Sequence, residues 1–212
     1  MKHVRLLFLV CFYLLVFSCR QQESAEMKVD PQAEAKRQQY LNGVMEPNRG
    51  LEDIELGKTT YAELIASLGD QYQVSKQEVS ESSCHPYPDC TKDKYTEVKV
   101  TYSDIFSFGF EHLKPGWDLN KLLVTSILVD CYGKANCPFQ GLTKEGIKIG
   151  HEVTRLESVY GQPLPNGNQL NKPCFSQGVC FHFSFPKNNQ ERVISAIQIY
   201  PRNHPDLTQK RK

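Results

Sequence analysis

The sequence predicts an α+β fold built from two tandem helix-plus-antiparallel-sheet repeats with local disulfides. Three observations support this prediction. Two short helical patterns, at residues 57–69 and 150–161, each begin and end at a glycine. Segments with aromatic or aliphatic residues at every second position follow each pattern, which is typical of strands with one face on a core. Six cysteines form three pairs with the same spacing.

The first eighteen residues predict a signal peptide. Lys2 and Arg5 supply positive charge at the start, and residues 6–17 are an unbroken apolar run. A membrane-spanning helix needs about 20 apolar residues, so this run is too short to span and has the length of a signal-peptide core. The alternative is a short buried helix, which fits poorly with the polar stretch that follows.

The apolar run ends at Val16-Phe17-Ser18-Cys19, which resembles the lipobox of bacterial lipoproteins. Val16 and Ser18 match that pattern, whereas Phe17 stands where a small residue is usual. The resemblance implies cleavage before Cys19, a lipid on its thiol and anchoring of the chain in the bacterial envelope. Arg20 stands where an Asp would mark retention in the inner membrane, which implies the outer membrane, on its periplasmic side or at the cell surface. An ordinary secretory protein is the alternative.

Residues 19–50 are interpreted as the lipidated cysteine and a polar tether that holds the module away from the membrane. Asp30-Pro31 predicts the start of a short helix within it, because Asp is a good N-cap and Pro suits the first helical position. Residues 32–41 are rich in helix-forming residues, which agrees with that start.

The first repeat is expected at residues 51–141. Thr60 and Glu63 predict a capping box at the start of its helix, and Gly69 ends it. The apolar residues on one face of this helix are Tyr61, Leu64, Ile65 and Leu68. Alternation predicts strands at 98–102 and 106–110, followed by a more buried strand at 123–129.

The second repeat is expected at residues 142–201, and residues 202–212 form a polar tail. The apolar face of its helix carries Val153, Leu156, Val159 and Tyr160, and Gly161 ends the helix. Strands are predicted at 181–185 and 193–200, with a turn at 187–190 between them. A single unduplicated α+β domain is the alternative.

The two glycine-bounded helices, with strands after each, resemble the tandem repeats of β-lactamase inhibitor proteins and of small outer-membrane barrel-assembly lipoproteins. The resemblance covers only the patterns at 57–69 and 150–161 and their strands. It implies a protein-binding scaffold without chemistry. No binding residue carries over from it.

The equal spacing of the cysteines predicts local disulfides. An exported chain meets an oxidising compartment, so we expect pairing within each gap, worth roughly 2 kcal/mol per bridge on the loop-entropy model. The expected pairs are Cys84–Cys90, Cys131–Cys137 and Cys174–Cys180. Structural zinc is the alternative, but paired zinc ligands usually stand closer together, so no metal is expected.

Two partial catalytic motifs fail on inspection. Gly57-Lys58-Thr59-Thr60 looks like the end of a phosphate-binding loop, but Glu52 occupies the place of its first glycine. His151-Glu152 begins like a zinc-protease motif, but Arg155 stands where the second histidine belongs. We therefore expect no catalytic residue and no cofactor.

Trp117, the only tryptophan, follows Pro115-Gly116 in a predicted turn. The favoured interpretation is a lid over the sheet edge, and the alternative is an exposed anchor for a partner, since Trp is enriched at binding hot spots. Phe106, Phe108 and Phe110 are expected in the core rather than at an interface.

The chain carries 25 basic and 24 acidic residues, a balance that argues against nucleic-acid binding. Together these features predict a lipid-anchored envelope protein with a non-enzymatic protein-binding module, whose partners are the membrane and another protein. Two alternatives stay open: an envelope hydrolase with a site assembled from dispersed residues, and a purely structural envelope lipoprotein.

Overall fold

The computed structural model describes residues 30–69, 72–82, 92–134, 136–164, 172–184 and 192–201. The chain divides into residues 1–31 and 32–212, and nearly all described residues belong to the second part. The helices are α2 (Pro31–Asn42), α3 (Tyr61–Leu68), α4 (Thr154–Tyr160) and the 3-10 helix η1 (Leu119–Lys121). The strands are β1 (Val44–Glu46), β2 (Gly50–Leu51), β3 (Ile54–Glu55), β4 (Tyr72–Ser82), β5 (Lys92–Tyr102), β6 (Phe106–Phe110), β7 (Val124–Asp130), β8 (Leu142–Thr143), β9 (Cys174–Phe175), β10 (Val179–Ser184) and β11 (Val193–Ile199).

Seven of these strands form one antiparallel sheet in the order β4-β5-β6-β7-β11-β10-β9. The predicted α+β class is therefore confirmed. The strands expected of the two repeats meet where β7 pairs with β11, so they belong to a single sheet.

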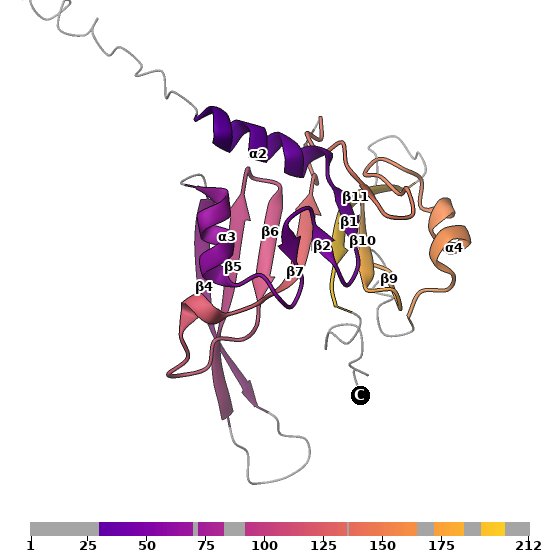
Figure 1. Cartoon of the computed structure of the whole chain (residues 1–212). Coiled ribbons are helices and arrows are strands. Elements are labelled where there is room, and N and C mark those ends of the chain that lie inside the picture. The colour runs from indigo at the N-terminus through magenta and orange to yellow at the C-terminus, as the bar shows by residue number, and fades with distance from the viewer. Residues whose placement is uncertain are drawn as a thin grey trace, which may run out of the picture. The chain divides into compact units, whose positions relative to one another are not determined.

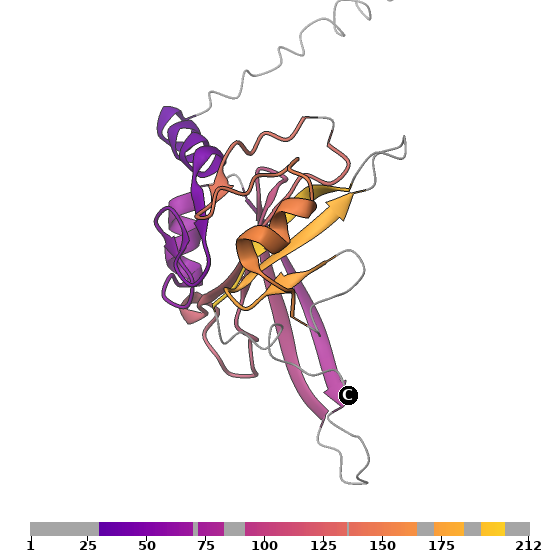
Figure 2. The same ribbon diagram turned by 90° about the vertical axis from the view of Figure 1, so that its right-hand side faces the viewer.

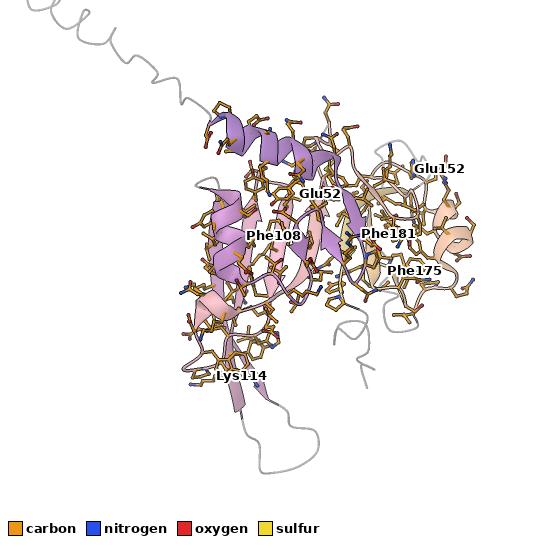
Figure 3. All side chains as sticks on the ribbon, in the orientation of Figure 1. Glu52, Phe108, Lys114, Glu152, Phe175 and Phe181 are labelled. Atoms are coloured by element: carbon orange, nitrogen blue, oxygen red, sulfur yellow. A yellow bond between two sulfur atoms is a disulfide. The ribbon has the colours of Figure 1, made fainter. Side chains whose placement is uncertain are left out.

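One face of this sheet carries the core, and α2, α3 and the small strands β1–β3 all lie on that side (Figures 1 and 2). Register alignment sets Val100 beside Phe108 and Phe108 beside Ile127, so these side chains share the core face. Phe108 lies between α3 and the sheet, whereas Phe175 and Phe181 lie near α4 (Figure 3). The predicted core position of the phenylalanines of β6 is confirmed, since all three are buried.

Two β-bulges interrupt the sheet at comparable places. The register between β6 and β7 shifts between Gly109 and Phe110. The register between β10 and β11 shifts between His182 and Phe183. A bulge adds one residue to one strand and increases the local twist.

Helix α3 begins as predicted. The Thr60 side chain accepts a hydrogen bond from the Glu63 backbone N–H, and the Glu63 carboxylate accepts one from the Thr60 backbone N–H. Leu64 and Leu68 are buried against the sheet. Gly69 has a positive φ of 64°, but its ψ of −142° lies outside the left-handed helical region expected of this cap.

Helix α4 departs from the prediction on one face. Leu156 and Tyr160 are buried, and Val153 packs against the core, but Val159 is 36% exposed. The helix is only seven residues long, so its contact with the sheet is narrower than the four-residue apolar pattern implies.

The sequence predicts a tether over residues 19–50, but residues 31–50 belong to the fold. The expected helix forms as α2, and its last turn buries Tyr40 and Leu41. Met45 in β1 is fully buried, and β1 pairs with β2 and with β8 in a second, four-stranded sheet. Burial of these apolar side chains ties the segment to the core, so the part of the chain available as a tether ends near Asp30.

Strand β4 and the first part of β5 were not predicted. They pair over eleven residues and form a long hairpin that projects past the rest of the sheet (Figure 1). Residues 73–78 are all exposed, so this strand has no apolar alternation that a sequence pattern could reveal.

Candidate functional site

The turn that carries Trp117 is fixed to the sheet at its start. Leu113 and Thr96 exchange two backbone hydrogen bonds, at 3.0 and 2.9 Å, which continue the sheet beyond β6. The chain then turns at Pro115-Gly116, and the Trp117 N–H donates to the Lys114 carbonyl at 3.1 Å. Gly116 has a φ of 82°, which a glycine adopts without strain.

The β4–β5 hairpin forms the opposite wall of a cleft beside this turn. The cleft has a volume of about 440 Å³. Its lining residues come from β4, from β5 and from the turn, and they are Glu78, Val79, Lys94, Tyr95, Thr96, Leu113, Lys114, Pro115, Gly116 and Trp117. We call this feature the Trp117 cleft.

Trp117 is 51% exposed, so half of a large aromatic surface faces solvent at the cleft. The Lys114 ammonium lies 5.4 Å from the centre of the indole ring, within the range of a cation–π contact. Figure 3 shows Lys114 beside the projecting hairpin. The Trp117 ring is half-exposed and borders a cleft. Its role as an anchor for a partner stays a prediction.

The charge of the cleft is positive. Lys94 and Lys114 are exposed on its two walls, and Glu78 is the single carboxylate of its lining. Exposed charges of this kind contribute little to stability, but they select and steer a charged partner.

Tyr95 lines the cleft and contacts His112, which lines a hollow on the open face of the large sheet. Its ring stacks flat on the His112 imidazole, with 3.9 Å between centroids and 4° between planes. The hollow on the open face has a volume of about 300 Å³, and Ser107, Ser126 and Gln198 are among its lining residues.

His182 lies on the same open face. Its Nε2 is buried and has no hydrogen-bond partner among the described residues. Burial lowers the pKa of His182 below 6.5, the positive charge of Lys172 lowers it further, and contacts with Gln198 and Asp130 offset this only in part. The imidazole is therefore neutral at pH 7.

A third hollow, of about 290 Å³, contains three carboxylates beside α3. Each of them has a partner. Burial alone would raise the pKa of Asp53, but hydrogen bonds from Lys36 and Tyr40 outweigh it and lower that pKa. Lys58 lowers the pKa of Glu55, and the Thr60 backbone N–H lowers that of Glu63. All three are ionised near neutral pH, whereas a hydrolytic carboxylate pair needs one member with a raised pKa.

A fourth hollow, of about 480 Å³, lies beneath α4. Its apolar lining includes Leu156, Phe175 and Phe183, all of which are already buried in the core. Unlike the Trp117 cleft, this hollow is not bordered by a half-exposed aromatic ring.

The two partial motifs form helix starts or local contacts. Lys58 forms an ion pair with Glu55 at 2.6 Å, and Thr60 caps α3. Residues 57–60 therefore lead into the start of this helix. The His151 imidazole accepts a hydrogen bond from the Lys148 backbone N–H at 3.2 Å. Burial lowers the pKa of His151, and the charges of Arg155 and Lys148 act in the same direction.

Two of the three expected disulfides form, Cys131–Cys137 after β7 and Cys174–Cys180 between β9 and β10. Cys84 and Cys90 lie outside the described residues, as does the proposed lipid site Cys19. In the described part of the chain, no group of three or more His, Cys, Asp or Glu side chains is placed to hold a metal ion.

Comparison with protein-family models, curated proteins and solved structures finds no match for this chain. No helix within the described ranges combines the length and apolar character needed to cross a membrane.

Proposed function

We propose that this chain is a lipid-anchored protein of the bacterial envelope whose module binds another protein, without catalysis, at the Trp117 cleft. The lipobox-like sequence ending at Cys19 supports the anchor, and Arg20 favours the outer membrane. The disulfides Cys131–Cys137 and Cys174–Cys180 agree with an oxidising compartment.

The observation that carries the binding proposal is the half-exposed ring of Trp117 beside a cleft. A large aromatic side chain held by a fixed turn can bury much area at a small cost in side-chain entropy. The turn is fixed by the paired backbone bonds of Leu113 and Thr96. Such an anchor needs little rearrangement when a partner docks.

The chemistry of the lining indicates the kind of partner. Lys114 lies over the indole ring and Lys94 lines the same cleft, so a complementary segment carries a carboxylate next to an apolar or aromatic side chain. The carboxylate would lie near the lysines, and the apolar side chain would cover Trp117.

The proposal is tested by crosslinking the lipoprotein in intact cells and identifying its partner by mass spectrometry. The matched control is Tyr132→Ala, because Tyr132 is an aromatic residue that is 70% exposed and does not line the cleft. Trp117→Ala should weaken binding of that partner by about 2 kcal/mol or more, roughly 30-fold in Kd, as expected of a hot spot.

Capture of a partner supports the proposal only if Trp117→Ala loses it and Tyr132→Ala keeps it. Reversal of both lysine charges, Lys94→Glu with Lys114→Glu, should also weaken binding, and more strongly at low salt. A partner retained by Trp117→Ala would place the interface elsewhere and contradict the proposed site.

The lipid anchor has its own test. Cys19→Ala should leave an uncleaved or soluble chain, measured by partitioning into detergent. Cys19→Ser is a useful second variant, because it keeps the size of the side chain but removes the thiol. Unchanged partitioning of either variant would contradict the assignment of Cys19.

We also propose that the sheet derives from two tandem repeats, α3 with β5–β7 and α4 with β9–β11. The bulges at Gly109/Phe110 and His182/Phe183 occupy matching register positions and support it. The entry into each helix also bridges to the last strand of its own repeat.

These bridges follow one pattern. Thr60 pairs with Leu123 before α3, and Glu152 pairs with Val193 before α4. The Gly57 N–H donates to Val124, and the Gly150 N–H donates to Ile194, both at 2.8 Å. In this correspondence β4 has no counterpart among the described residues of the second repeat.

A further inference from the structure

Strand β4 forms one edge of the large sheet, and this edge is long. Its eleven residues pair with β5 on one side, and among the described residues no strand pairs with its other side. The opposite edge is the two-residue strand β9, which a disulfide ties to β10. Proteins normally protect or use a long edge strand, because its unpaired backbone groups readily accept another strand.

The register shows which backbone groups of β4 face outward. Thr96 in β5 uses both its N–H and its C=O on Leu113, on the side away from β4. Glu78 lies opposite Thr96 in the β4–β5 ladder. In an antiparallel pair such a position is not hydrogen-bonded, so the N–H and C=O of Glu78 point away from β5. The same holds for Lys76 and Val74, two and four residues earlier.

We propose that a second copy of this chain occupies the edge, through antiparallel pairing of β4 with β4 about a two-fold axis at Gln77. In this register Lys76 of each copy lies opposite Glu78 of the other. Two copies joined in this way form one continuous sheet with a closed two-fold interface.

Charge complementarity selects this register over its neighbours. Shifting the axis to residue 76 sets Lys76 opposite Lys76, and shifting it to residue 78 sets Glu78 opposite Glu78. Like charges directly opposite each other destabilise a strand pair, whereas opposite charges stabilise it. Only the axis at Gln77 makes two opposite-charge pairs from these side chains.

The side chains of β4 are available for this contact. Residues 73–78 are exposed, and Val74 is 39% exposed although it is apolar. The axis at Gln77 sets Val79 opposite Ser75, so Val79 gains a neighbour on its own face of the sheet. The pairing needs no side chain to leave the core.

The dimer proposal does not rest on partner binding at the Trp117 cleft, but the two surfaces share Glu78. Glu78 lines the cleft and also faces Lys76 of the second copy. Dimerisation therefore takes up the one carboxylate of the lining and leaves Lys94 and Lys114 as its charges.

The experiment introduces a single cysteine, Gln77→Cys, in the full chain in its native membrane. Residue 77 lies opposite itself across the axis at a non-hydrogen-bonded position, where Cα atoms are about 4.5 Å apart and within reach of a disulfide. Gln73→Cys is the matched control on the same face of β4. Two copies of residue 73 would lie roughly 27 Å apart, eight residues along the strand.

The expected result on non-reducing gels is a disulfide-linked homodimer for Gln77→Cys and none for Gln73→Cys. In the Gln77→Cys background, Lys76→Glu should reduce the dimer severalfold, and adding Glu78→Lys should restore it. Equal crosslinking at both cysteines, a dimer insensitive to charge reversal, or crosslinking of residue 77 to a different protein would overturn the proposal. A protein that stays monomeric in all variants would overturn it as well.

Discussion

Thr125 and Ser195 make the same hydrogen bond at two different β-bulges. The Thr125 hydroxyl donates to the Gly109 carbonyl at 3.4 Å, and the Ser195 hydroxyl donates to the His182 carbonyl at 3.2 Å. Each is the extra residue of its bulge, since the register passes over Thr125 and over Ser195. A hydroxyl at this position satisfies the carbonyl of the facing strand where the ladder is interrupted.

Replacing either hydroxyl should therefore weaken its bulge by a similar amount. Thr125→Val and Ser195→Ala are each expected to lower the free energy of unfolding by about 1 kcal/mol, the net value of a typical hydrogen bond. Because the two bulges share no contact, the double variant should lose the sum of the two effects. Urea unfolding of the purified chain measures this, and a strongly non-additive double variant would show that the bulges are coupled.

Tyr40 fastens α2 to the loop after β2 and to α3. Its hydroxyl donates to Asp53 at 3.0 Å and shares a 2.8 Å hydrogen bond with Ser67. Tyr40→Phe should lower the free energy of unfolding by about 1–3 kcal/mol, because it removes both hydrogen bonds of the hydroxyl, one of them to a carboxylate. It should also speed hydrogen exchange in α2. Tyr132→Phe, at an exposed position, is the control and should change neither quantity.

The buried imidazole of His182 predicts loss of stability in mild acid. Its pKa is lowered in the folded protein, chiefly by burial, so the unfolded chain takes up a proton first as the pH falls through 6.5. The His182 contribution to the free energy of unfolding should therefore be constant near pH 7 and above, and fall as the pH drops below 6.5 until the folded pKa is passed.

His182→Gln should flatten this part of the profile, because glutamine does not titrate. His151 contributes in the same direction and stays in place as an internal reference, since its pKa is also lowered by burial. Unfolding curves between pH 5 and pH 8 provide the measurement. An identical slope in the variant and the natural protein would contradict a buried neutral His182.

The disulfide Cys174–Cys180 closes the hairpin of the short edge strand β9. The two cysteines are register partners across that hairpin. Replacing both with serine should cost about 2 kcal/mol of stability on the loop-entropy model. Cys131 and Cys137 close a loop of the same length outside the sheet and provide the matched comparison.

Peptide mapping under non-reducing conditions checks all three pairs together. We expect a Cys84–Cys90 peptide beside the two bridges of the described residues. Any peptide that joins cysteines from different pairs would contradict local pairing.

The parts of the fold that sequence reasoning predicted have a local physical signal. The capping box of Thr60 and Glu63 involves two side chains three residues apart, and the alternation at Phe106, Phe108 and Phe110 reflects one buried face. Strand β4 lacks such a signal. Its backbone is held by hydrogen bonds to β5, and neither of its faces is deeply buried, so no apolar alternation marks it in the sequence. Strands β2, β3 and β8 have only two residues each, too few for any periodicity.

The candidate site was also predictable from the sequence only where it depends on neighbouring residues. Pro115-Gly116 predicted the turn and Trp117 was singled out, but the cleft depends on residues from β4 and β5 that are distant in the sequence. Its second wall is the hairpin that sequence analysis missed. The exposure of Trp117 could therefore not be decided before the strands were placed.

The integration of α2 into the fold restricts where the module can operate. If Cys19 carries the proposed lipid, only eleven residues, Arg20 to Asp30, separate it from the first residue of α2. Even fully extended, such a length reaches about 40 Å, compared with about 110 Å for a tether running to residue 50. The module would stay within this short distance of its own bilayer. Its binding partners would therefore be molecules embedded in, or bound to, the same membrane surface.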